Sequence, residues 1–156
     1  MAEKLLNPFS FYHLEQFTTP YLVRKQIEGV EFIFSIEDRD ARLWYDLYCT
    51  DPVWNEMRFI RDHLLSKGAI VLEAGSHHGC TAILLAHWVG LDGHVYAFEP
   101  GSQNFNILKG NVELNHIPNI TCLPLAVGAE NGIVDFIESR NSSMGSHIAQ
   151  SSVNST

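Results

Sequence analysis

The chain of 156 residues has the length of a single domain, and its 46% hydrophobic and 18% charged residues are typical of a globular protein rather than a disordered or fibrous one. Its formal net charge of −8 argues against a nucleic-acid backbone as the main partner, because phosphate binding relies on Lys and Arg. The three cysteines lie far apart and show no CxxC spacing, which argues against a zinc site or a disulfide framework.

Residues 1–68 are predicted to form an N-terminal extension that leads into the main domain. Its first stretch contains Pro8 and several polar side chains and therefore lacks the apolar core of a signal peptide. No apolar run in the chain approaches the ~18 residues of a membrane span, so we expect a cytoplasmic protein with no membrane partner.

The extension carries one strand pattern and one helix pattern. Residues 30–36 place every second side chain on one apolar face, which predicts a strand: Val30, Phe32, Phe34 and Ile36. Asp51 and Pro52 are typical of a helix start, and the predicted helix ends at Gly68. Five apolar side chains form one stripe along this helix, which indicates core packing: Trp54, Met57, Ile60, Leu64 and Leu65.

Residues 69–138 alternate between strand and helix patterns. Predicted strands cover 69–72, 94–98 and 120–123, the first read as buried on both faces and the last running on toward Ala126 and Val127. Predicted helices cover 81–89 and the segment that begins with Ser102 as its cap. This order predicts an α/β fold, a Rossmann-like, doubly wound and mostly parallel sheet with helices on both faces.

The end of the chain predicts less regular structure. The Glu130-Asn131-Gly132 stretch predicts a hairpin turn before a strand over 133–137. Residues 139–156 are rich in serine and lack periodicity, so we expect a loop or tail. A complete doubly wound domain needs further strands, so we expect a chain cut off in mid-fold. Its exposed sheet edge would favour self-association into a homo-oligomer.

The loop after the first strand of the main domain lies at the default ligand position of this fold. In the sequence VLEAGSHHGCT (71–81), Gly75 would allow a tight reversal, and Gly79 would let the next helix pack closely on the sheet. Glu99 ends the second strand, 24 positions after Gly75, where a carboxylate can accept both hydroxyls of a ribose.

Two residues distinguish between cofactor classes. A dinucleotide loop needs a glycine where this chain has His77, because the backbone must approach the pyrophosphate there. Glu73 would repel a pyrophosphate but suits a ligand with an ammonium or sulfonium group. S-adenosyl-L-methionine has both groups and is therefore the expected cofactor, with an NAD(P)-dependent oxidoreductase as the disfavoured alternative.

Four stretches together resemble the FkbM family of S-adenosylmethionine-dependent methyltransferases: VLEAGSHHGCT (71–81), GHVYAFEP (93–100), NVELN (111–115) and PLAVG (124–128). The resemblance implies that Glu73, Gly75 and Gly79 line the methionine end of the cofactor and that Glu99 holds its ribose. It also implies that Phe98 and Pro100 shape the pocket and that Leu125 and Ala126 lie near the adenine.

The sequence departs from the family pattern at two places. Ser76 and His77 replace the usual alanine and asparagine of the loop, and both can still hydrogen-bond to the cofactor. The later Leu-Asp and Lys-x-Asp-x-Glu-Gly segments, which help to build the acceptor side, are missing.

The adjacent His77 and His78 do not predict a metal site, because neighbouring residues rarely direct two imidazoles at one ion and no third ligand has suitable spacing. His77 could act as a general base. The simpler expectation is that its ring donates to a backbone carbonyl or to the cofactor carboxylate. The expected function is methyl transfer to the hydroxyl oxygen of a small molecule or glycan. A non-catalytic cofactor-binding or interaction module is the alternative from a different class.

Overall fold

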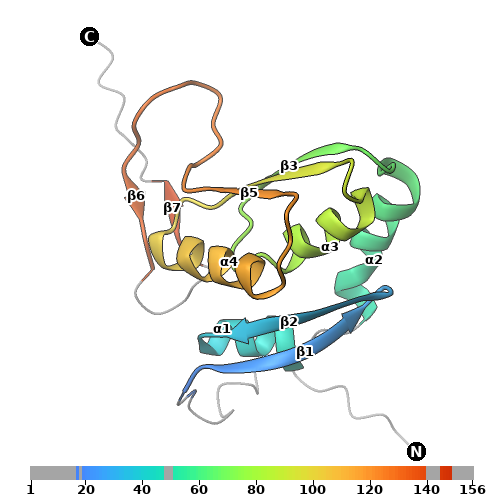
Figure 1. Ribbon diagram of the computed structural model, residues 1–156. Helices are drawn as coiled ribbons and strands as arrows, with labels where there is room; N and C mark the ends of the chain where they lie inside the picture. The colour runs from blue at the N-terminus through green and yellow to red at the C-terminus, as the bar shows by residue number, and fades with distance from the viewer. Residues whose placement is uncertain (1–16, 18, 48–50, 140–144, 149–156) are drawn as a thin grey trace, which may run out of the picture.

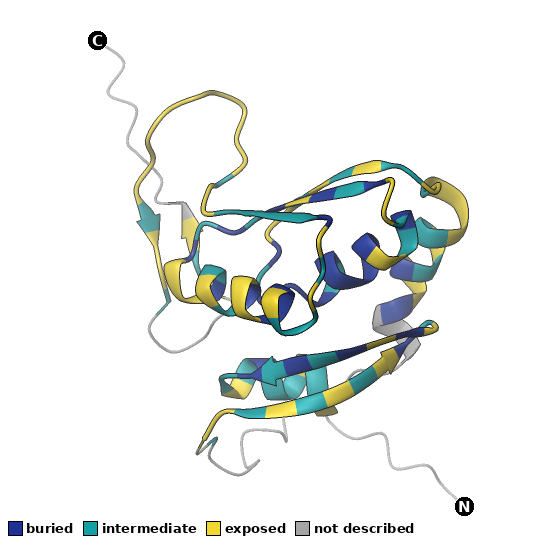
Figure 2. Ribbon diagram, viewed as in Figure 1, coloured by how far each residue is buried: buried dark blue, intermediate teal, exposed yellow. Residues whose placement is uncertain are grey.

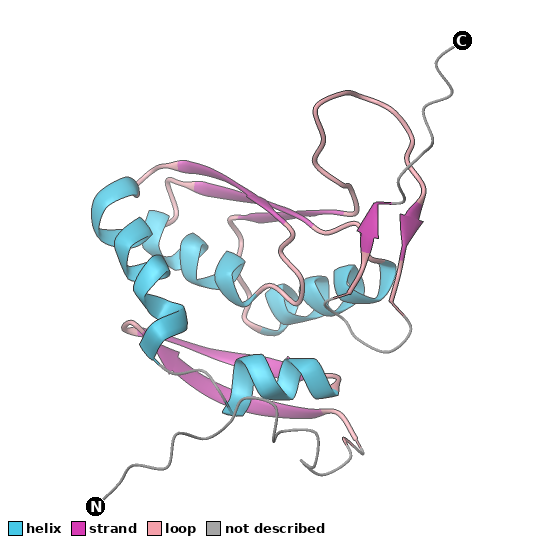
Figure 3. Cartoon of the chain, turned by 180° about the vertical axis from the view of Figure 1, so that it is seen from behind, coloured by secondary structure: helices cyan, strands magenta, loops and turns pink. Residues whose placement is uncertain are grey.

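The computed structural model describes residues 17, 19–47, 51–139 and 145–148, and it shows a mixed α/β fold in three layers (Figure 1). The first layer is a parallel sheet of strand order β3-β4-β5: β3 Ile70–Ala74, β4 His94–Phe98 and β5 Ile120–Leu123. The second layer holds two helices, α3 Cys80–Val89 and α4 Ser102–Leu114. The third is an antiparallel hairpin, β1 Tyr21–Ile27 and β2 Val30–Ile36, and the view from behind shows the same order of layers (Figure 3).

Short elements connect and extend these layers. A helical segment follows the hairpin, formed by α1 Arg39–Ala41 and the π-helical η2 Arg42–Leu47. A second one leads into the sheet, formed by α2 Asp51–Phe59 and the π-helical η3 Ile60–Leu64. Near the end of the chain, β6 Phe136–Ile137 pairs antiparallel with β7 His147–Ile148.

The sheet confirms the predicted α/β class and brings the ends of its strands to one edge. Ala74 lies opposite Phe98 in the register of β3 and β4, and Phe98 lies opposite Leu123 in the register of β4 and β5. The loops that follow the three strands therefore leave the sheet side by side. That edge is where parallel α/β sheets bind ligands.

Helix α3 lies between the sheet and the hairpin, which explains its largely apolar sequence. Helices that are apolar all round are buried all round. Seven of its ten residues are buried, and they are Cys80, Ala82, Ile83, Leu84, Leu85, Ala86 and Val89. The hairpin supplies the covering surface through the predicted apolar face of β2, whose Val30, Phe32, Phe34 and Ile36 are all buried.

Strand β1 was not predicted from the sequence. Its side chains alternate between half-buried and exposed as far as the buried Ile27, and polar residues occur on both faces, so no apolar stripe marks it. Its turn is local and well suited to a hairpin: Glu28 and Gly29 both adopt positive φ, at 49° and 81°. Two such central residues are the signature of a turn whose twist matches that of the paired strands.

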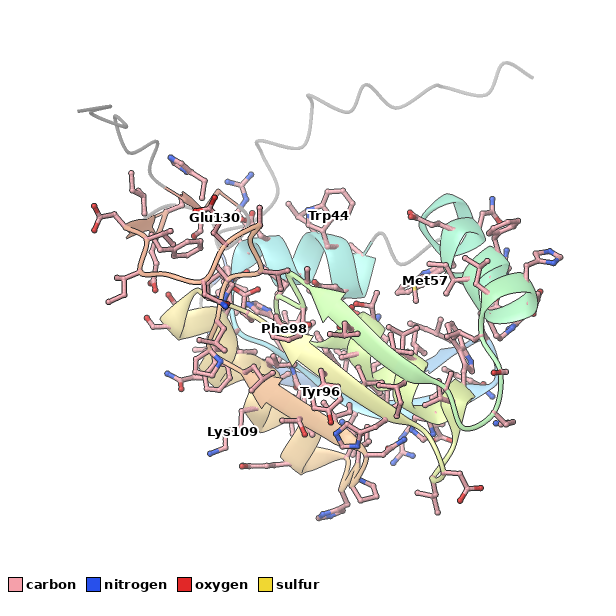
Figure 4. The ribbon with its side chains drawn as sticks, turned by 90° about the horizontal axis from the view of Figure 1, so that it is seen from above. Trp44, Met57, Tyr96, Phe98, Lys109 and Glu130 are labelled. Atoms are coloured by element: carbon pink, nitrogen blue, oxygen red, sulfur yellow. The ribbon has the colours of Figure 1, made fainter. Side chains whose placement is uncertain are left out.

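One face of the parallel sheet is exposed, contrary to the prediction that β3 is buried on both faces. Ile70 is 61% exposed, Leu72 71% and Tyr96 37%. Figure 4, which looks down on this face, shows Tyr96 on it, and Figure 2 shows the buried residues gathered on the helical side. The predicted second helical layer is not found among the described residues, whose helices α3 and α4 share one face.

Three predicted boundaries and one predicted hairpin were wrong. The second helical segment ends at Leu64 rather than Gly68, because Leu65 is extended, and the Leu64 side chain is 68% exposed. Gly101, not Ser102, caps α4. Strand β5 ends at Leu123. The Glu130-Asn131-Gly132 stretch makes no hairpin, because residues 131–135 are not strand and β6 pairs with the later strand β7.

Candidate functional site

The loop from Gly75 to Gly79 reverses the chain between β3 and α3 through three left-handed residues. Gly75, His77 and Gly79 have φ values of 78°, 50° and 89°. The amides of Gly75 and Ser76 donate to the carbonyl oxygen of Phe98 at 2.9 and 3.0 Å, so the loop is tied to the end of β4. The loop is thus a fixed turn at the ligand edge of the sheet.

The two glycines serve different purposes. A Cβ atom added to Gly79 would lie 2.5 Å from Cδ1 of Leu108 on α4, so this position lets the two helices pack closely. A Cβ atom added to Gly75 would meet nothing within 4 Å. Open space in front of Gly75 agrees with the predicted approach of a ligand to the backbone there.

Glu99 ends β4 and holds the loop. Its side chain is only 5% exposed, and its carboxylate accepts the His77 amide at 2.8 Å and the Gly101 amide at 2.9 Å, one on each oxygen. Each carboxylate oxygen keeps a second lone pair for a further donor. Glu99, the predicted ribose acceptor, therefore also holds the backbone of the two loops that follow β3 and β4.

Glu73 ends β3 and presents a carboxylate that is only half paired. One oxygen accepts the Thr81 hydroxyl, whereas the other oxygen is buried with no hydrogen-bond partner among the described residues. Burial raises the pKa of this carboxyl above its usual range. A buried acceptor without a donor is costly, and a cation or N–H donor on a ligand would satisfy it.

Ser76 and His77 were predicted to face the cofactor, and the structure gives both of them protein partners. The Ser76 side chain is buried, and its hydroxyl donates to the carbonyl oxygen of Glu73 at 3.3 Å. Nδ1 of His77 lies 2.8 Å from the hydroxyl of Tyr45. The partner of Nδ1 is therefore a phenol, whereas the sequence predicted that the ring would donate to a backbone carbonyl or a cofactor carboxylate.

His78 is part of the packed wall behind the loop. It is fully buried and stacks on His77, with ring centroids 3.9 Å apart and planes inclined by 18°. Its Nε2 lies 3.2 Å from Oδ1 of Asn104 and 3.7 Å from Oδ2 of Asp38. Burial chiefly lowers the pKa of His78 to about 4, so its ring is neutral at pH 7.

Sequence reasoning missed Tyr45 and Asp38, which reach the site from the N-terminal segment. Tyr45 lies in η2, 32 positions before His77, and no local pattern links residues at that separation. Its neighbour Trp44 is 46% exposed, and Figure 4 shows it on the helical segment beyond the carboxyl end of β4, where Phe98 lies. The helical segment formed by α1 and η2, with Asp38 before it, thus flanks the candidate site.

The remaining predicted residues lie along the same edge. Phe98 and Pro100 are half-buried and flank Glu99. Leu125 and Ala126 follow β5, and the Leu125 side chain is 53% exposed. No group of three or more His, Cys, Asp or Glu among the described residues could hold a metal ion. None of the described helices is long and apolar enough to cross a membrane.

No family model and no curated protein matches the chain. Solved structures with a similar arrangement include a proposed rRNA methylase from Clostridium thermocellum, at 20% identity and a TM-score of 0.45 over 49% of this chain and 43% of that one. A SAM-dependent methyltransferase from Aquifex aeolicus is 24% identical, with a TM-score of 0.41 over 51% of this chain and 43% of that one.

A third similar structure is M. jannaschii TYW2 in complex with AdoMet, at 19% identity and a TM-score of 0.47 over 65% of this chain and 42% of that one. The chain therefore spans less than half of the length of each of these three proteins. All three TM-scores lie below 0.5, so the function proposed below rests on the chemistry of the site.

Proposed function

We propose that this chain forms the cofactor-binding part of an S-adenosylmethionine-dependent methyltransferase of the FkbM type, acting on a hydroxyl of a small molecule or glycan. The observation that carries the proposal is the pair of carboxylates at adjacent strand ends, Glu73 and Glu99, on either side of the loop that contains His77. The unpaired oxygen of Glu73 suits an ammonium or sulfonium group, and the free lone pairs of Glu99 suit ribose hydroxyls.

The same residues argue against a dinucleotide. A pyrophosphate needs the backbone exposed at the second loop position after Gly75, and there the structure holds His77, whose amide is already bound to Glu99. The carboxylate of Glu73 would repel the phosphates. The site therefore favours a cationic adenosyl ligand over NAD(P).

When bound, the cofactor would supply a methyl group activated on a sulfonium for transfer to the acceptor oxygen, and the hydroxyl proton would pass to water. The residues of this chain would bind and orient that group, and alignment accounts for much of such catalysis. The acidic net charge makes a nucleic-acid acceptor an unfavourable partner on electrostatic grounds, and that exclusion stays a prediction.

Calorimetric titration with S-adenosylhomocysteine and with NAD tests this proposal. We expect heat of binding with S-adenosylhomocysteine and none with NAD. In Glu99→Gln one acceptor oxygen becomes an amide that faces a backbone N–H, and we expect affinity to fall at least about tenfold. Glu138→Gln is the matched control, because Glu138 accepts the amide of Ser102 from the surface. No heat with either ligand would refute the proposal, and heat with NAD alone would replace it.

A further inference from the structure

The contact between Tyr45 and His77 joins the N-terminal segment to the candidate cofactor loop. The hydroxyl of Tyr45 lies 2.8 Å from Nδ1 of His77, and the two rings are 5.7 Å apart between centroids. Tyr45 is itself held by Phe34 of β2, with ring centroids 5.0 Å apart. The contact is therefore supported from the hairpin side and is not a chance meeting of exposed side chains.

Chemistry decides the direction of this hydrogen bond. If Nδ1 of His77 were the donor, the phenol proton of Tyr45 would need another acceptor. Within the described part of the chain, His77 is the hydrogen-bond partner of that hydroxyl. An unpaired O–H in a partly buried site is unfavourable. Burial chiefly, and then the nearby carboxylates of Glu73, Asp38 and Glu99, raise the pKa of Tyr45, so it remains a protonated phenol. Tyr45 is therefore the donor and Nδ1 the acceptor.

We propose that Tyr45 is a positioning residue that fixes His77 in the tautomer with its proton on the buried Nε2, so that the ring does not act as a general base. A neutral imidazole has one lone pair on a ring nitrogen, and the bond from Tyr45 uses it. The ring then has no lone pair left to accept the proton of an acceptor hydroxyl. This inference rests on the proposed function only for the identity of the ligand that His77 would meet.

The backbone reinforces the assignment. The positive φ of His77, 50°, is uncommon for residues other than glycine. Its amide is held by Glu99 and its ring is stacked on the neutral His78. Contacts with Glu99, His78 and Tyr45 therefore restrain the His77 backbone and ring from three sides.

The tautomer can be read directly by long-range ¹H–¹⁵N NMR of ¹⁵N-histidine-labelled protein at about pH 8, where a histidine of ordinary pKa is neutral. We expect the His77 signals, assigned by their loss in His77→Asn, to show a protonated Nε2 and an unprotonated Nδ1. Tyr45→Phe should move the ring toward the other tautomer. The matched control Tyr21→Phe removes a phenol that donates to Asp46 in the same segment, and it should leave His77 unchanged.

Affinity provides the second readout. Tyr45→Phe should weaken S-adenosylhomocysteine binding by about 2–10-fold, the value of one hydrogen bond, whereas Tyr21→Phe should change it by less than about twofold. A wild-type His77 protonated on Nδ1, or His77 signals that Tyr45→Phe leaves unchanged, would overturn the inference. The wild-type spectrum decides the tautomer even where Tyr45→Phe does not fold. A wild-type protein that binds no S-adenosylhomocysteine would refute the proposed function alone.

Discussion

Asn111 of α4 donates its side-chain amide to the carbonyl oxygen of His78 at 2.9 Å, which joins the helical layer to the candidate cofactor loop. Its Oδ1 accepts the backbone amide of Ser35 in β2 at 2.8 Å. One fully buried side chain thus connects the hairpin, the helix and the loop. One turn later, Asn115 pairs with both the N–H and the C=O of Ile33, at 2.7 Å each. The two asparagines therefore bind the edge of β2 as a further strand would.

Replacing Asn111 should destabilise the fold strongly. Asn111→Ala leaves a backbone N–H and a backbone C=O without partners, and each such group costs about 1–3 kcal/mol when buried. We expect the free energy of unfolding to fall by about 2–4 kcal/mol in urea denaturation. The exposed Asn106 of the same helix is the control, and Asn106→Ala should change stability by less than about 0.5 kcal/mol. Equal stability of the two variants would contradict the bridging role.

The asparagine pair also shows what sequence could and could not predict. The spacing of Asn111 and Asn115 is visible in the sequence, but their partners Ser35 and Ile33 lie 76 and 82 positions away. Periodicity predicted β2 because that strand buries one face, and apolar composition predicted α3 because most of its side chains are buried. Periodicity missed β1, which buries no complete face, and it missed Tyr45, whose role depends on a distant loop.

The glycines of the chain should respond to alanine in three different ways. Gly79→Ala forces a side chain into left-handed backbone and against Leu108, and we expect a loss of about 3 kcal/mol or more. Gly75→Ala meets only the backbone strain, about 1–2 kcal/mol, because the space in front of it is open. Gly110→Ala, in the exposed interior of α4, should stabilise by about 0.5–1 kcal/mol. Thermal melting of the three variants checks this order, and a Gly110→Ala variant that melts below wild type would contradict it.

Glu73 should favour function at a cost to stability. Because burial raises the pKa of Glu73 in the folded state, the fold must hold a buried charge at higher pH. The stability of wild type relative to Glu73→Gln should therefore fall as pH rises through that raised pKa, and the variant should be the more stable at pH 7. Urea denaturation of both proteins across pH measures the difference.

The same Glu73→Gln variant should bind S-adenosylmethionine at least about tenfold more weakly, since it loses a charge-assisted contact. Thr81→Val separates the two effects, because it removes the hydroxyl that donates to Glu73 and leaves the carboxylate in place. Unchanged affinity in Glu73→Gln would remove Glu73 from the cofactor site, whatever its effect on stability.

The buried His78 should make the fold sensitive to mild acid. Its pKa is lowered from 6.5 to about 4, chiefly by burial, so between these values the unfolded chain binds a proton that the folded chain does not. The free energy of unfolding should therefore fall by up to about 3 kcal/mol as pH decreases from about 6.5 to about 4, and it should not change for this reason above about 6.5.

Neighbouring groups require a difference measurement for this effect. Asp38 favours the protonated form of His78, and protonation of Glu73 acts in the opposite direction on stability over the acid range. His78→Gln keeps an N–H that can reach Asn104 but carries no titratable ring, so the change in stability between pH 7 and pH 5 should be smaller in the variant than in wild type. Parallel curves for the two proteins would show that His78 takes up its proton as readily in the fold as in the unfolded chain.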